Sequence, residues 1–182
     1  GALVRLLPIA RDTEASLRTA FELAEGADLI VTIGGASVGD HDIVADVAAQ
    51  MGMQQSFYKV AMRPGKPLMA GRLGGAAMIG LPGNPVSAMV CGKIFLAPAL
   101  RALLGLGSAA APRQRAVLAC DLAANGPREH YMRSRLDAGR ISPHSRQDSA
   151  LLTVLADANA LLVRPVGDAA RAAGSEVDCI LL

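Results

Sequence analysis

The chain has 182 residues, of which 52% are hydrophobic, 19% are charged and only 3% are aromatic, and its formal net charge is +2. This composition supports a folded core and argues against disorder, and the length suits one domain, or a moderate domain with a small one. The small charge and the few aromatic side chains argue against a nucleic-acid partner, and three widely spaced cysteines favour a reduced, cytoplasmic protein.

No targeting or membrane segment is expected. The start of the chain has no secretory signal, and because residue 1 is Gly, we expect that an N-terminal part is missing. The longest uncharged stretch, 73–92, is interrupted by Pro82 and Pro85, which argues against a membrane span.

The first half of the chain alternates helices with apolar strands. A helix is expected after Asp12 or Thr13, either of which can cap it, and a buried strand is expected at 28–33. A glycine-rich segment follows at 34–40, and Asp42 can cap the next helix.

Further strands are expected at 56–61, 68–70 and 76–80, before a long helix from Val86 to about Leu104. This alternation implies an open, mostly parallel sheet.

The pattern changes after a Gly-, Ala- and Ser-rich linker at 105–112. One short helix is expected at 149–156, capped by Ser149. Short strands are expected at 116–122, 131–136, 160–165 and 177–182. We therefore predict two domains, an α/β domain over 1–108 and a small, mainly β domain over 109–182.

The glycine-rich segment is the first candidate for chemistry. Gly34, Gly35 and Gly39 allow sharp turns that bring backbone N–H groups close to a ligand, and Ser37 adds a hydroxyl. Junctions between strand and helix at the carboxyl edge of a sheet bind ligands, phosphate above all. A tight turn without a ligand explains the same residues equally well.

Carboxylates surround this segment. Asp12 and Asp42 precede helices, where a capping role suffices, and Asp40 ends the glycine-rich segment. Yet carboxylates beside a phosphate site need a cation, which suggests Mg²⁺ held by Asp40 and Asp42. Both interpretations stay open.

Two proline-containing turns complete the set of candidates. Lys59, Arg63 and Lys66 lie on a strand end and its turn, and suit either an oxyanion or solvent. In the second turn, Asn84 can cap the long helix, or the turn can form a second rigid ligand-binding loop. That turn consists of Pro82, Gly83, Asn84 and Pro85. The histidines, His41, His130 and His144, lack ligand spacing and are interpreted as surface residues.

Three linked motifs carry a family resemblance. TIGGASVGDHD, KVAMRPGKP and GLPGNPVSA, in this order and at these intervals, closely resemble the molybdopterin molybdenumtransferases, which are the MoeA-type enzymes and the related C-terminal domain of gephyrin. ARDTEASLRTAF upstream, and HYMRSRL and QDSALLTVLADANALLV downstream, extend the resemblance over nearly the whole chain.

The resemblance implies a fold and a reaction. It implies a three-layer open-sheet molybdopterin-binding domain, truncated at its N-terminus, followed by a small barrel-like β domain. Family members insert molybdate into adenylylated molybdopterin, with Mg²⁺-dependent hydrolysis of the adenylate and release of AMP. They act as homodimers of four-domain protomers, and the upstream molybdopterin adenylyltransferase is an expected partner. Because two domains would be absent here, the isolated chain is expected to show weak or no turnover.

The resemblance also implies roles for single residues. Asp12, Asp42, Lys59, Arg63 and Lys66 fall at the catalytic positions of the family, although Lys is usual where Arg63 stands. The glycine-rich segment, the PGNP loop and two polar residues of the β domain, Arg133 and Ser149, are expected to bind the cofactor.

Two alternative functions stay open, one a different enzyme and the other a binding module. A molybdopterin adenylyltransferase shares the α/β domain, but that family has no second domain such as the one expected here. A binding or scaffold module without chemistry, as in the receptor-anchoring use of gephyrin, would need a peptide-binding surface on the β domain.

Overall fold

A four-stranded sheet, sheet A, forms the centre of the N-terminal half of the chain. The computed structural model describes residues 1–35, 42–107 and 109–182. Sheet A has the strand order β1-β5-β4-β2, with β1 (Leu29–Ile33), β2 (Gln54–Tyr58), β4 (Met69–Leu73) and β5 (Ala76–Leu81).

Sheet A is mixed, so the prediction of a mostly parallel sheet is wrong. Only β1 and β5 run parallel, whereas β4 is antiparallel to both β5 and β2. The reason is local: Gly74 and Gly75 form a two-residue turn between β4 and β5, and such a turn joins antiparallel strands.

Two helices cover one face of sheet A. Helices α1 (Glu14–Leu23) and α2 (Ile43–Gln50) bury Leu17, Phe21 and Val47 against Met69 and Met78 of the sheet. Thr13, not Asp12, caps α1 through a bond from the Ser16 amide. Asp42 caps α2 as predicted, because its side chain accepts a hydrogen bond from the Ala45 amide.

The predicted long helix is present from Pro85 to Leu103, but it is not uniform. Helix α3 (Pro85–Cys91) continues through one π-helical turn, η1 (Gly92–Leu96), into α4 (Ala97–Leu103). Pro98 explains the wider turn, because proline has no N–H and its ring would clash with the carbonyl one turn earlier in a regular helix.

The 19-residue helix has a mean hydropathy of 1.5, which is long and apolar enough to cross a membrane by length and composition alone. Its residues Val86, Val90 and Cys91 are fully buried in a core cluster, whereas 22% of the apolar stretch as a whole is buried.

The C-terminal half forms a small β-barrel, as predicted, built on sheet B. The strand order is β3-β7-β8-β6-β10-β9, and β7 also pairs with β9, which closes the ring. The strands are β6 (Gln114–Leu118), β7 (Glu129–Asp137), β8 (Arg140–Pro143), β9 (Ala160–Arg164) and β10 (Glu176–Leu181), with one helix, α5 (Leu152–Asp157).

Ser149 does not cap α5, so that prediction is wrong. The helix begins after Leu151, which forms no side-chain cap. Asp148 instead closes a local turn by accepting a hydrogen bond from the Ala150 amide at 2.9 Å, so the chain enters the helix later.

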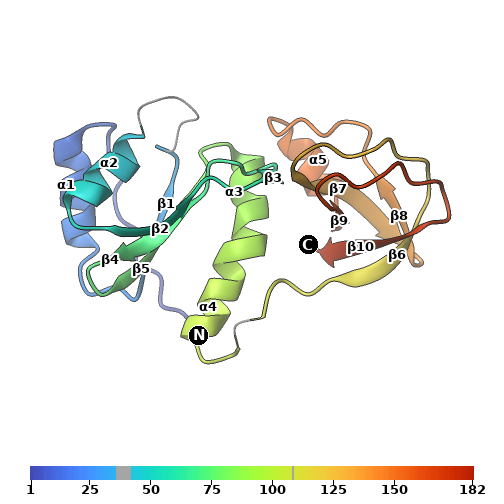
Figure 1. The fold of residues 1–182 in the computed structure, drawn as a ribbon. Coiled ribbons are helices and arrows are strands. Elements are labelled where there is room, and N and C mark those ends of the chain that lie inside the picture. The colour runs from blue at the N-terminus through green and yellow to red at the C-terminus, as the bar shows by residue number, and fades with distance from the viewer. Residues whose placement is uncertain (36–41, 108) are drawn as a thin grey trace.

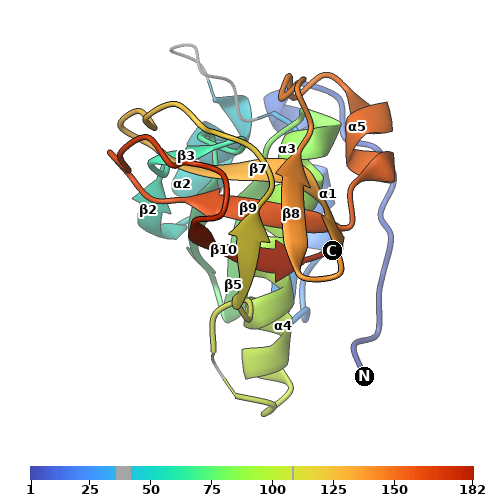
Figure 2. The same cartoon turned by 90° about the vertical axis from the view of Figure 1, so that its right-hand side faces the viewer.

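The two halves share one core. Between β2 and β4 the chain makes an excursion, residues 59–68, which we call the crossing segment. It carries β3 (Met62–Arg63), which pairs in parallel with β7 of the barrel. Met62, Leu81 and Val86 from the first half pack in one buried cluster with Tyr131 and Leu161 of the barrel. Figure 1 shows the α3–α4 helix between the two sheets. In Figure 2 the barrel faces the viewer.

The boundary at 108/109 stays a prediction. Residue 108 lies outside the described residues, and between Leu103 and Gln114 the described chain has no helix or strand. The crossing segment belongs to the first half in sequence and to sheet B in space, so no single cut point separates the sheets.

A buried ion pair anchors the loop that follows β9. Arg164 is 3% exposed, and its Nε lies 2.6 Å from Asp168 Oδ2. Arg171 binds Oδ1 of the same carboxylate at 2.7 Å. Hydrogen bonding to Arg171, with a further contribution from Arg164, holds the pKa of Asp168 below its ordinary value.

We predict that Asp168→Asn destabilises the fold. Leaving the buried Arg164 charge unpaired should cost about 2 kcal/mol in urea denaturation at pH 7. Because its folded-state pKa is lowered, Asp168 stabilises the fold above the ordinary aspartate pKa, and this contribution is lost as the pH falls through the lowered value. The variant should therefore lose stability less steeply in acid. Asp178→Asn, at an exposed pair with Arg115, is the matched control and should have little effect. Equal losses in both variants would contradict the assignment.

Candidate active site

Two loops touch at the carboxyl edge of the parallel strands. Ile33 of β1 is in register with Leu81 of β5, and the Gly34 amide donates to the Leu81 carbonyl at 3.1 Å. A Cβ added at Gly83 would stand 3.2 Å from Gly34 Cα, so the backbones are in close approach. The structure thus brings the start of the glycine-rich segment against the PGNP loop.

The PGNP loop leads directly into α3. Pro82 is buried, and Asn84 caps the helix by accepting a hydrogen bond from the Ser87 amide at 3.2 Å. Pro85 occupies the first helical turn, where its missing N–H has no intrahelical partner to lose. Capping therefore accounts for Asn84, while the exposed Gly83 is the position that meets the other loop.

The described part of the glycine-rich segment is Gly34 and Gly35. Ser37, Gly39 and Asp40 lie outside the described residues, so their predicted roles stay predictions. Gly35 is described, with a φ of +74°, and a Cβ there would overlap Val44 of α2. Only glycine fits this backbone, which holds the segment close to the start of α2.

Asp42 is buried beside this segment. It is 7% exposed, and one carboxylate oxygen, Oδ1, accepts the capping bond from the Ala45 amide at 3.0 Å. The other oxygen, Oδ2, is buried and makes no hydrogen bond of regular geometry among the described residues, although the Tyr58 side chain interacts with this carboxylate. A buried carboxylate oxygen that is not fully hydrogen-bonded is costly, and a ligand donor or a cation would satisfy it.

Tyr58, which the sequence did not single out, links Asp42 to the crossing segment. Burial raises the pKa of Tyr58, and hydrogen bonding to Asp42 and the negative charges of Asp42 and Asp46 raise it further. The Lys59 ammonium lies 4.8 Å from the centre of the Tyr58 ring. Lys59, one of the three predicted basic residues, thus lies on the same side of this edge as Asp42.

Arg63 lies on the other side, against the barrel. It is exposed, and it pairs in register with His130 of β7. Lys66, at the far end of the same turn, is exposed too. The crossing segment therefore distributes its three cations along the line where the two halves meet.

Arg133 and Ser149 stand on the barrel side of this line. Arg133 is 1% exposed, and its guanidinium donates to Gln147 Oε1 at 3.3 Å and to the Asp148 carbonyl at 2.9 Å. Burial lowers the pKa of Arg133, and the nearby Arg63 charge lowers it further against the opposing effect of Asp148. Ser149, next to Asp148, is partly buried.

His130 is not the surface residue that was predicted. It is half-buried, and burial together with the charges of Arg63 and three other arginines lowers its pKa to about 4. The imidazole is therefore neutral near pH 7 while its surroundings are strongly positive. No sequence spacing indicates this, because the pairing partner of β7 is about 65 residues away in the chain.

Asp12 remains exposed at the start of α1. The chain runs from α1 back into β1, so α1 begins at the level where β1 ends, and α2 begins there as well. Topology thus places Asp12 at the same edge as Asp42. In Figure 1 the start of α3, the crossing segment at β3, and α5 lie along the upper side of the molecule.

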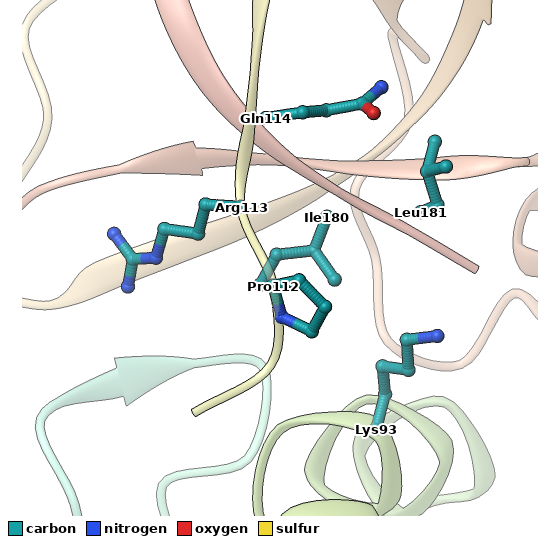
Figure 3. Close-up of a pocket in the computed structure, with 6 residues that line it drawn as sticks. All are labelled: Lys93, Pro112, Arg113, Gln114, Ile180 and Leu181. Carbon is teal, nitrogen blue, oxygen red and sulfur yellow. The ribbon is translucent and has the colours of Figure 1, made fainter. Parts of the chain in front are cut away.

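Two cavities among the described residues lie away from this edge. One, of about 180 Å³, is a partly open pocket between the π-helical turn and the barrel (Figure 3), lined by Lys93, Pro112, Arg113, Gln114, Ile180 and Leu181. A larger, open one of about 670 Å³ is lined by residues that include Asp28 and Gly74, at the opposite edge of sheet A. Neither contains a predicted site residue.

Two family models match the chain. Residues 1–102 match the probable molybdopterin binding domain, and residues 115–182 match the MoeA C-terminal region, domain IV.

Named relatives and solved structures agree with these matches. The chain is 37% identical to molybdopterin molybdenumtransferase 2 of Mycobacterium tuberculosis, over 85% of this chain and 40% of that protein. It is 34% identical to the molybdopterin molybdenumtransferase of Nostoc, over 97% of this chain and 43% of that protein. The crystal structure of a molybdopterin biosynthesis MoeA protein from Pyrococcus horikoshii superposes with a TM-score of 0.77 at 26% identity, over 94% of this chain and 42% of that one. The chain thus spans about 40% of the length of the curated relatives it matches.

We predict that the pKa of His130, followed by NMR, rises from about 4 in Arg63→Ala, because a cation that opposes its protonation is removed. Binding of an oxyanion at Arg63 should raise it as well. Arg72→Ala, which removes an exposed cation from β4 of sheet A, is the matched control. Because its folded-state pKa lies below the unfolded value, His130 is protonated more readily in the unfolded chain. Its effect is therefore to lower the stability of the fold as the pH falls below the unfolded pKa, and it has no such effect at higher pH. No change in Arg63→Ala would show that Arg63 does not face His130.

Proposed function

This chain belongs to the molybdopterin molybdenumtransferase family, and from that premise we propose that the protein acts in molybdenum cofactor biosynthesis, inserting molybdate into adenylylated molybdopterin with release of AMP. Molybdopterin and molybdate are its proposed substrates. The match of the second half to the MoeA C-terminal region favours this reaction over adenylyl transfer by an enzyme made of the α/β domain alone.

The contact between Gly34 and Gly83 is the observation that carries the proposal. It brings two loops, one after each parallel strand, to one edge of sheet A. Such an edge presents backbone N–H groups to an anion, and we propose that it binds the phosphate of the pterin. Gly34, Gly35, Ser37 and Gly39 would contribute from the first loop, and the PGNP residues from the second.

The second part of the proposal concerns the cations of the crossing segment, which would stabilise negative charge. Adenylate hydrolysis joins a water oxygen to one phosphorus of the anhydride while the bond to the other phosphate breaks, and negative charge grows on both phosphates. Lys59, Arg63 and Lys66 would offset this charge and that of molybdate, which is a positioning and electrostatic contribution. Arg133, buried and held by an amide oxygen and a carbonyl, adds positive charge from the barrel side.

A magnesium ion is a further part of the proposal. The described residues contain no group of three Asp, Glu, His or Cys side chains that could hold a metal by themselves. The buried Oδ2 of Asp42, which makes no hydrogen bond of regular geometry among the described residues, nevertheless fits a cation that takes one or two carboxylates and otherwise phosphate and water. Asp42 and Asp40 would hold it, with Asp12 nearby, and the ion would neutralise charge at the pyrophosphate.

A homodimer, an upstream adenylyltransferase as partner and a cytoplasmic location complete the proposal. Cys91, Cys120 and Cys179 are all free thiols, as suits a reducing compartment.

We predict that Asp42→Asn abolishes AMP release without unfolding the protein. Asparagine can keep the capping bond to the Ala45 amide but carries no charge for a cation. AMP should be measured chromatographically in the protein at its natural length, with adenylylated molybdopterin, molybdate and Mg²⁺. Asp46→Asn, an exposed position on the same helix, is the matched control. An Asp42→Asn variant that releases AMP at the normal rate would refute the assignment of Asp42.

A further inference from the structure

The tip of the crossing segment rests on the long helix. Gly65 is buried with a φ of +107°, and a Cβ at this position would overlap Cys91 Sγ. The Cys91 thiol in turn points at the Gly65 carbonyl, with Sγ 3.8 Å from the oxygen. Arg63 and Lys66 flank this contact two residues before it and one residue after it.

Backbone hydrogen bonds hold the crossing segment on either side of this tip. The ends of the segment are closed by bonds from the Lys59 amide to the Leu68 carbonyl and from the Val60 amide to the Lys66 carbonyl. At β3, the Glu129 amide of β7 donates to the Ala61 carbonyl. Between these points Pro64 and Gly65 are buried, and the side chain closest to Gly65 is Cys91, with the Met62 thioether beside it.

We propose that Cys91 is a positioning residue, whose side chain sets where Arg63 and Lys66 stand relative to the two loops at the edge of sheet A. This inference rests on the proposed function only in assigning an oxyanion to these cations. The contact between Gly65 and Cys91 is independent of it.

The helix explains how one small side chain can set this distance. Asn84 caps α3, and Cys91 follows seven residues later, so both lie on the same side of the helix. Their separation along the axis is roughly 10 Å and is fixed by the helical rise. The PGNP loop and the tip of the crossing segment are thus held at a set spacing by one rigid element.

The chemistry of Cys91 suits a steric role. The residue is fully buried, and burial raises the pKa of its thiol to about 12, which keeps it neutral and unreactive. Its function would then depend on its size, because a larger or smaller side chain moves the surface on which Gly65 rests.

The test is a double-mutant cycle on the chain. Gly65→Ala forces a Cβ against Sγ and should displace the tip, whereas adding Cys91→Ala removes Sγ and makes room. Because the positive φ at residue 65 remains strained in alanine, recovery in the double variant should be partial. Cys179→Ala, at an equally buried cysteine of the barrel, controls for loss of a core thiol.

Two properties of each variant are measured, amide hydrogen exchange and molybdate binding. Amide hydrogen exchange of Lys59 and Val60 reports the segment itself, with the Ala77 amide, bonded to the Asp28 carbonyl at the other edge of sheet A, as reference. Calorimetric titration with molybdate reports the placement of the cations.

We expect Gly65→Ala to speed exchange at Lys59 and Val60, but not at Ala77, and to weaken molybdate binding about tenfold or more. The double variant should recover part of both effects, and Cys179→Ala should show neither. A double variant no better than Gly65→Ala, or exchange accelerated equally at Ala77, would overturn the role of Cys91. If the unmodified chain binds no molybdate, the proposed oxyanion function fails, and the exchange rates still decide on Cys91.

Discussion

The parallel pairing of β3 with β7 is the constraint on which the site depends. Without it the crossing segment would be a loop of sheet A, and its cations would point into solvent. With it, Arg63 is fixed beside His130, and the barrel becomes part of the edge where β1 and β5 end. The shared core around Met62, Val86 and Tyr131 removes apolar surface of both halves from water at this junction. Contacts with both halves of the chain therefore position the cations of the crossing segment.

Two buried arginines of the barrel show how charge is distributed around the junction. The guanidinium of Arg164 is paired with Asp168, which stabilises the loop, although Arg171 shares the same carboxylate. Arg133, equally buried, is held instead by an amide oxygen and a carbonyl, so its positive charge is solvated but not cancelled. Burial lowers the pKa of His130 most, and this surplus of positive charge lowers it further. The same surplus makes the place suitable for an oxyanion.

The sequence predicted what depends on local patterns and missed what depends on distant pairing. Asp42 and Asn84 were predicted as caps from their positions before helices, and both cap. β3 is two residues long and its partner is distant in the chain, so nothing in its local pattern marks it as a strand. The burial of His130 and the contact of Gly65 with Cys91 follow from that pairing and were missed as well. The direction of β4 was missed although Gly74 and Gly75 signal a hairpin. The roles of Ser37, Gly39 and Asp40 rest on the sequence alone, because these residues lie outside the described part of the chain.

The central claim is that cations from the first half and the barrel form one oxyanion-binding surface. The most direct measurement is the map of amide chemical-shift changes when molybdate is added to the chain. We expect changes in both halves together, at Arg63 and Lys66 of the crossing segment and at His130 and Arg133 of β7, with none at Gly74 on the opposite edge. Changes confined to one half, or centred on Gly74, would contradict it.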